Sequence, residues 1–255
     1  MFKLMKIVFL YISFLFVLLV NTNAQEFNDQ DSIPPREEKV VVPDTVPVQK
    51  SISFGINLTG PVQQLAFYHS RSDYGFSVTL SLLKKFHFTS EFGFLSINEN
   101  INVKVKDVKG NDVIKCQYDY LANGQFINLG FDYNIFKKNK PGEHNMVFLG
   151  CRYGISTLKH SASNIFIVDS YWGDITNDKF PETSVNAQWF EIDGGLRVYL
   201  FKNIALGWSG RYRILTHSTN MKIVKPLIIP GYGKGSETST WGFNYSIYYT
   251  IPFFK

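Results

Sequence analysis

Apolar and polar residues alternate with a period of two in eight separate segments that begin at Ser51. Successive side chains of a β-strand point to opposite faces, so each segment is predicted to be a strand with one apolar and one polar face. The composition agrees, because the 23 Phe, 14 Tyr and 4 Trp residues favour strands over helices. The segments are 52–59, 74–82, 86–94, 127–135, 147–156, 190–200, 204–214 and 241–253.

The connections between these segments alternate in length. Short connections follow the second, fourth and sixth segments: Leu83–Lys85, Lys137–Asn145 and Phe201–Asn203. Long ones follow the first, third, fifth and seventh: Gln63–Ser72, Ser96–Gln117, Leu158–Val185 and Ser218–Thr238. An even strand number with short turns at one end and long loops at the other is typical of membrane barrels. The predicted fold is therefore all-β, an eight-stranded antiparallel up-and-down transmembrane β-barrel that spans residues 51–255.

A soluble eight-stranded barrel of the lipocalin type is the alternative, and it would place the apolar face inside. Two observations argue against it. The polar faces contain glycine in all eight segments but no lysine, whereas a water-facing surface is normally rich in lysine. The apolar faces are also too bulky for the interior of an eight-stranded barrel. We therefore expect the apolar faces to contact lipid, and we expect the protein to be located in the outer membrane.

The N-terminal 50 residues differ from the rest of the chain. Residues 1–24 combine Lys3 and Lys6 with an apolar run from Ile7 to Val20, which is typical of a signal peptide. Residues 25–50 contain four prolines and many charges, which predicts a flexible periplasmic tail. The formal net charge is +5, or +3 without the two signal-peptide lysines. That charge is too weak to indicate nucleic-acid binding.

The region from Ser51 onward resembles the small eight-stranded outer-membrane barrels of the OmpA/OmpX-like class found in Gram-negative envelopes. Its most specific part is the last segment, which resembles the signal that the barrel-assembly machinery recognises in its clients. Here Phe253 and Phe254 are followed by Lys255, whereas the usual pattern ends on the aromatic residue. The resemblance implies that lipid and the assembly machinery are partners. The residues of the assembly signal are Trp241, Phe243, Tyr245, Ile247, Tyr249, Ile251 and Phe253.

Four acidic and four basic residues fall on the predicted inward faces. Buried charges persist only when they are paired, and arginine can bind a carboxylate at two points. We therefore expect a salt-bridge network that fills the lumen. A proton or ion pathway through a small passive pore is the alternative. The eight residues are Glu91, Asp132, Arg152, Glu191, Asp193, Arg197, Arg211 and Arg213.

Other candidate sites give weaker signals. Cys116 and Cys151 are predicted to lie about 45 Å apart along the strands, too far for a disulfide. No spacing typical of a metal or cofactor site is present, and we expect none to be bound. An outer-membrane lipid-modifying enzyme (a lipid A acylase, deacylase or phospholipase) would need a set of His, Ser and acidic residues. The candidates for that set are His160, Ser161, Ser163, Asp169 and His217, which lie in no recognisable motif.

The loop after the third segment is itself patterned, because Ile101, Val103 and Val105 alternate before Lys109–Asp112. This pattern predicts a strand pair that continues beyond the membrane, and an exposed strand edge can accept a strand from a partner. The function favoured by the sequence is a structural or interaction role: envelope integrity, surface binding or a subunit of a secretion or assembly machine. Envelope proteins would then be the partners, and no enzymatic activity is expected.

Overall fold

The computed structural model describes residues 50–66, 70–83, 85–106, 112–136, 145–168, 173, 175–220 and 225–253. The predicted signal peptide and nearly all of the predicted tail lie outside these residues, as do Phe254 and Lys255. Among the described residues, no helix is both long and apolar enough to cross a membrane.

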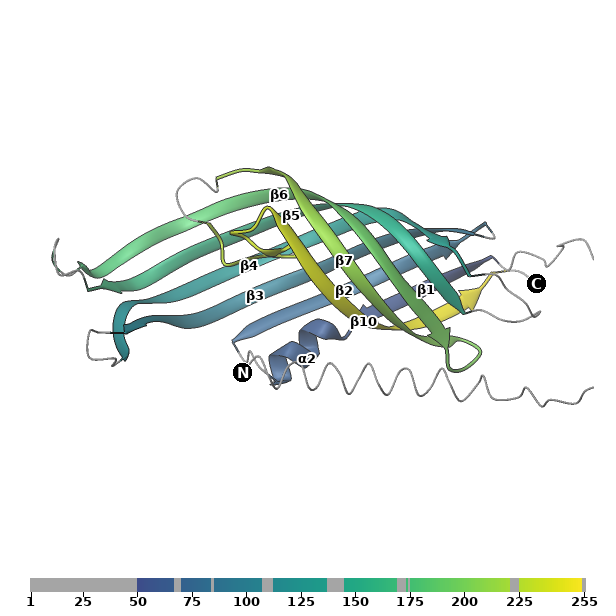
Figure 1. Cartoon of the computed structure of the whole chain (residues 1–255), viewed down its shortest axis with the longest axis horizontal. Helices are drawn as coiled ribbons and strands as arrows, with labels where there is room; N and C mark the ends of the chain where they lie inside the picture. The colour runs from purple at the N-terminus through teal and green to yellow at the C-terminus, as the bar shows by residue number, and fades with distance from the viewer. Residues whose placement is uncertain are drawn as a thin grey trace, which may run out of the picture. The chain divides into compact units, whose positions relative to one another are not determined.

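Eight antiparallel strands pair side by side and close into a barrel in the order β1-β10-β7-β6-β5-β4-β3-β2 (Figure 1). Each strand pairs with its neighbours in sequence, and β10 closes the ring by pairing with β1. The barrel strands are β1 Ser51–Asn57, β2 Arg71–Ser81, β3 Phe86–Lys106, β4 Asp112–Asn134, β5 Met146–Ile167, β6 Ile175–Tyr199, β7 Ile204–Ser218 and β10 Ser239–Pro252. The remaining elements are α2 Thr59–Ala66, β8 Ile228–Ile229 and β9 Gly233–Lys234.

The alternation of the sequence matches the two faces of the barrel wall. Large apolar side chains on the outer face are exposed, whereas polar side chains on the inner face are buried, the reverse of a soluble barrel. A closed ring satisfies the backbone hydrogen bonds that a bilayer leaves unsatisfied, and the outer face matches lipid. The protein is therefore a transmembrane β-barrel of the outer-membrane type. The exposed belt includes Phe54, Ile56, Phe88, Phe92, Leu129, Phe131, Leu149, Ile192, Phe243, Ile247 and Ile251.

The barrel wall is much taller on one side than on the other. Strands β3 to β6 have 21, 23, 22 and 25 residues, whereas β1 has 7. The predicted strand pair after the third segment is therefore confirmed, because Ile101 pairs with Tyr118 and Val103 pairs with Cys116. The prediction of a loop over Leu158–Val185 was wrong for most of its length, since β5 and β6 continue through it. We call the end of the barrel with these long hairpins the distal end. We call the part of β3–β6 that continues beyond the ends of β2 and β7 the extension.

The first strand is shorter than predicted, and a helix replaces its distal part. β1 ends at Asn57, opposite Gly75 of β2 and Ser246 of β10, although both neighbours continue toward the distal end. α2 occupies the chain after this point and is bonded to both neighbours. Thr59 Oγ1 accepts a hydrogen bond from the Tyr245 amide at 2.9 Å, and Gln64 Nε2 donates to Ser72 Oγ at 3.1 Å. The predicted connection Gln63–Ser72 is thus partly helix and partly strand.

The last long connection folds back into the distal mouth of the barrel. Within the predicted loop Ser218–Thr238, β8 and β9 form a small hairpin. Ile229 and Tyr232 of this hairpin are completely buried against Trp189 of β6 and Phe126 of β4. Gly231 and Gly233 have φ of 72° and 118°, a left-handed backbone that glycine adopts without strain. We call residues 225–238 the cap.

The two cysteines lie at different levels of the wall. Cys151 is paired with Phe131, whereas Cys116 is paired with Ile167 in the extension. Both thiols are free, as the predicted separation along the strands requires. A disulfide could not bridge them without rearrangement of the whole β4–β5 pair.

Candidate functional site

Seven of the eight predicted lumen charges lie together in one buried cluster of ion pairs. Arg211 binds Glu91 at two points, with both distances 2.6 Å, across the interior from β7 to β3. Arg213 donates its Nε to Glu191 Oε2 at 2.6 Å on the neighbouring strand β6. Two-point binding of a carboxylate fixes the orientation of both side chains. The cluster therefore ties opposite walls of the barrel together as well as adjacent strands.

Arg152 is the central residue of this cluster. Its guanidinium lies 2.8 Å from Asp193 and 3.0 Å from Asp132, the acidic neighbours on both sides of β5. The same group lies 3.1 Å from Glu91 and 3.7 Å from Glu191. Gly150, two residues away, leaves space for these carboxylates, because a Cβ there would lie 2.3 Å from Asp193 Oδ1 and 2.4 Å from Asp132 Oδ1. One cation is thus shared by four buried carboxylates.

Arg197 differs from the prediction, because the structure gives it no ion pair among the described residues. Its guanidinium lies 3.8 Å from the centre of the Tyr248 ring. Its Nη2 donates to Thr79 Oγ1 at 3.4 Å. Arg197 lies four residues beyond Asp193 toward the end of the barrel that carries the termini. A cation over an aromatic face is a stable alternative to a carboxylate partner.

An apolar layer lies between the ion pairs and the distal mouth. Tyr232 of the cap contacts the cluster directly, since its carbonyl accepts hydrogen bonds from Arg213 at 3.3 Å and from Thr240 at 2.6 Å. Trp189 packs on the Tyr232 ring, with 5.8 Å between ring centres. Sequence reasoning missed this layer. The available signal was an apolar run, Leu227–Ile229, inside the segment predicted to be a long connection.

His160 lies in a second apolar cluster, inside the extension. It is 1% exposed, and it packs between the rings of Tyr120 and Phe180 at 5.9 and 5.3 Å. Neither ring nitrogen has a hydrogen-bond partner. His160 pairs with Ala122 and lies five residues beyond Ile155, the last residue of β5 in the apolar belt, so it lies outside the lipid-facing belt. Burial lowers the pKa of His160 from its ordinary value of 6.5.

The residues considered for a lipid-modifying enzyme are not brought together. His160 points into the interior, whereas Ser161, the next residue of the same strand, points to the opposite face. His217 is on β7, paired with Gln188 of β6. Asp169 lies outside the described residues. A hydrolytic site needs the base within hydrogen-bond reach of a nucleophile, and His160 has no hydrogen-bond partner.

The extension has two outer strands, β3 and β6, and beyond β2 the edge of β3 has no neighbouring strand among the described residues. β2 pairs with β3 only as far as Ile97, and the Asn98 amide still donates to the Ser70 carbonyl at 2.9 Å. Beyond this point β3 pairs with β4 alone. Backbone groups alternate between the two sides of a strand, so Asn102 directs its amide to the same side as Asn98. In the described part of the chain, no strand occupies that side of Asn102.

The residues of the predicted assembly signal lie along the outer face of β10. Trp241 is the most exposed of them, at 74%, and its ring packs on Tyr212 of β7 with 4.7 Å between ring centres. The described residues contain no group of three His, Cys, Asp or Glu side chains that could hold a metal ion.

Several solved structures are remotely similar to this chain. The N-terminal β-barrel domain of Pseudomonas aeruginosa OprF has 12% identity and a TM-score of 0.38, over 80% of this chain and 98% of that one. Ail of Yersinia pestis, in complex with a heparin analogue, has 9% identity and a TM-score of 0.37, over 80% and 99%. A major outer membrane protein from Thermus thermophilus has 10% identity and a TM-score of 0.38, over 79% and 98%.

Comparison with curated protein sequences finds no match. The barrel architecture therefore rests on the strand pairing of this chain itself. A family model described as "Domain of unknown function (DUF6048)" matches residues 4–255, and the chain belongs to this family.

Proposed function

We propose that this outer-membrane barrel is an interaction protein that presents the extension to a protein partner. The observation that supports the proposal is the combination of a filled lumen with a wall that continues past the membrane on one side only. The interior of the described barrel contains a buried ion-pair cluster below an apolar cap, and the lumen of an eight-stranded barrel is only wide enough for side chains to fill. The extension takes no part in the strand pairing that closes the ring. Its contact with the cap, at the Tyr120 hydroxyl and the Leu227 amide, lies at its base, so the length beyond that point needs another explanation. Display of a binding surface is the simplest one.

The free edge of β3 is the part of the extension best suited to a partner. An unpaired edge offers main-chain donors and acceptors to an extended peptide, which adds as a further strand. Natural edges are usually protected by charges, prolines or bulges. The β6 edge has Pro181, and its Ser184 carbonyl accepts a hydrogen bond from Asn220. The β3 edge has no proline between Asn98 and Val103, and its register shift comes only after Val103.

The partner in this proposal is an extended segment of another envelope or cell-surface protein. The exposed apolar side chain of Val103 would add contact area beside the edge. The termini and the short turns would face the periplasm, as in barrels of this type, and the extension would face outward. During biogenesis, the outer aromatic residues of β10 would be recognised by the barrel-assembly machinery.

A proline at the edge tests this proposal. Asn102→Pro removes the amide donor that faces away from β4, so it blocks strand addition but keeps the β3–β4 ladder. Asn102→Ala is the matched control, because it shortens the same side chain and keeps the amide. We expect cross-linked purification of the full-length protein from isolated outer membranes to recover the same partner with the wild type and Asn102→Ala. Recovery should fall at least tenfold with Asn102→Pro.

Equal recovery of a partner with both variants would contradict the proposed edge. Recovery of the barrel without any partner would contradict the interaction role itself. Folding of each variant is checked by the shift in gel mobility on heating, so a lost partner is not confused with a lost barrel.

A further inference from the structure

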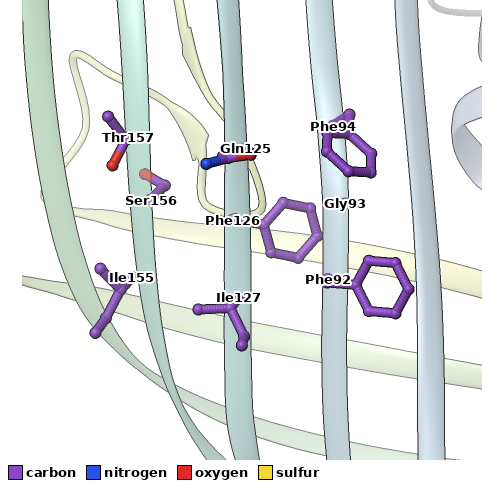
Figure 2. Close-up of a pocket in the computed structure, with 9 residues that line it drawn as sticks. All are labelled: Phe92, Gly93, Phe94, Gln125, Phe126, Ile127, Ile155, Ser156 and Thr157. Atoms are coloured by element: carbon purple, nitrogen blue, oxygen red, sulfur yellow. The ribbon is translucent and has the colours of Figure 1, made fainter.

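Where the apolar belt ends on the outer wall, β3, β4 and β5 form a groove. The groove has a volume of about 270 Å³, and Phe92, Phe94, Gln125, Ile127, Ile155 and Thr157 line it from the outside (Figure 2). A second groove of the same volume lies on the other side of Phe94. Tyr74, Ser72, Ser96 and Asn123 contribute to this second groove. The Phe94 ring therefore separates two adjoining hollows at the distal border of the apolar belt.

The register of the strands shows that polarity changes across the first groove. Phe92, Ile127 and Ile155 form one row across the three strands, and all three are apolar. The next row toward the distal end contains Phe94, Gln125 and Thr157. The row after that contains Ser96, Asn123 and Lys159. The boundary between hydrocarbon and the polar region of the bilayer is thus expected to cross the groove at the level of Gln125.

We infer that this pair of grooves binds one phospholipid molecule, with an acyl chain along Phe92, Ile127 and Ile155 and the ester region beside Gln125 and Thr157. The grooves are continuous with the lipid-facing belt, so a lipid of the surrounding membrane is the molecule that fills them. The Gln125 amide and the Thr157 hydroxyl can donate hydrogen bonds to ester carbonyls. The second groove runs from the row of Phe94 to the polar row of Ser96 and Asn123, so the headgroup would lie there.

The absence of charge in the lining favours a phospholipid over a lipid that is held by its phosphates. None of the residues that line either groove is charged. Lys159, in the next row, is paired with Glu182 at 3.2 Å. Recognition of a phosphate normally uses Arg or Lys. A site whose polar lining is uncharged should therefore accept phosphatidylethanolamine and phosphatidylglycerol equally well.

Filling the groove tests this inference. Thr157→Trp places an indole in the first groove, whereas Leu149→Trp places one at an exposed belt position of the same strand, away from the groove. The full-length protein in mild detergent is mixed with palmitoyl-oleoyl phosphatidylethanolamine, and bound lipid is counted by native mass spectrometry. We expect one retained lipid for the wild type and for Leu149→Trp, and at least fivefold lower occupancy for Thr157→Trp. Gln125→Leu, which keeps the shape and removes the amide, should lower occupancy at least twofold.

Three outcomes would overturn the inference. They are no retained lipid in the wild type, equal retention in Thr157→Trp and Leu149→Trp, or a preference above tenfold for phosphatidylglycerol or lipopolysaccharide. If Thr157→Trp does not fold, the lipid occupancy of Gln125→Leu tests the inference, and an unchanged occupancy would contradict it. The inference does not depend on the β3 edge, because the variants leave Asn102 and its neighbours unchanged.

Discussion

Arginine and carboxylate side chains fill the membrane-embedded lumen, where each unpaired charge would be strongly destabilising. Arg152 faces four carboxylates, whereas Arg197 packs on an aromatic ring and a hydroxyl group. The two residues have the same chemistry and nearly the same burial, at 3% and 4% exposed. Their difference lies only in their partners, so they form a matched pair for measuring what the ion-pair cluster contributes.

Replacement of Arg152 by methionine should destabilise the barrel far more than the same change at Arg197. Arg152→Met leaves Asp132 and Asp193 without a cation, and loss of one partner from a buried ion pair costs about 3–5 kcal/mol. Arg197→Met loses a cation–π contact, which is worth about 2 kcal/mol when desolvated. Urea titration of the free energy of unfolding in phospholipid vesicles measures both. Equal losses would show that the cluster contributes nothing beyond packing.

His160 should make the distal interior sensitive to pH. Its pKa in the folded state is lowered by burial, so the unfolded chain binds a proton more readily. The stabilisation is therefore fully present above the ordinary pKa of about 6.5 and is lost as the pH falls below it. We expect the amides of Ile228–Lys234 to exchange hydrogen faster at pH 5 than at pH 7, after correction for intrinsic exchange rates.

The control for this prediction is His160→Phe. A phenylalanine can pack between Tyr120 and Phe180 without burying two unpartnered nitrogens, which gains about 1–2 kcal/mol. This variant should show no difference in corrected exchange between pH 5 and pH 7. A pH dependence that persists in His160→Phe would assign the effect to another group.

At the scale of elements, the sequence predicts what depends on periodicity and fails where tertiary contacts decide. The eight strands and their two faces follow from alternation alone. The helix α2 does not follow from alternation. The apolar–polar pattern of the first segment continues to Thr59, so it does not show that the strand ends at Asn57. The local signal of α2 is Pro61 near the helix start, followed by Val62, Leu65 and Ala66 at helical spacing.

The cap and the β5–β6 part of the extension were missed for a similar reason, whereas the β3–β4 part was predicted from its own alternation. Their segments are polar or irregular in sequence, and they are ordered by packing against distant strands. Tyr232, for example, is buried by Trp189, which lies 43 positions earlier in the chain. Of the candidate site, the charged residues were predictable because arginine on an inward face needs a carboxylate. The aromatic partner of Arg197 was not predictable, because only the register of the closed barrel places Tyr248 beside it.

At the scale of the whole molecule, two layers close the interior in series. The cap fills the distal mouth with Ile229 and Tyr232, and the ion pairs join β3, β5, β6 and β7 beneath it. The layers touch where Arg213 donates to the Tyr232 carbonyl. A solute would have to displace both layers to cross, and an eight-stranded barrel has no spare width around them.

This arrangement predicts that the protein does not conduct ions, and that removing the cap does not make it conduct. We expect planar bilayers containing the full-length protein to show no stable conductance steps, with a porin as the positive control for insertion. A variant in which residues 226–237 are replaced by a short Gly-Ser turn should also remain at baseline, because Arg152, Glu91 and Glu191 still bridge the lumen. Stable steps in this variant alone would mean that the cap is the only barrier and would assign it a gating role. Stable steps in the wild type would contradict the sealed interior on which the proposed interaction role rests.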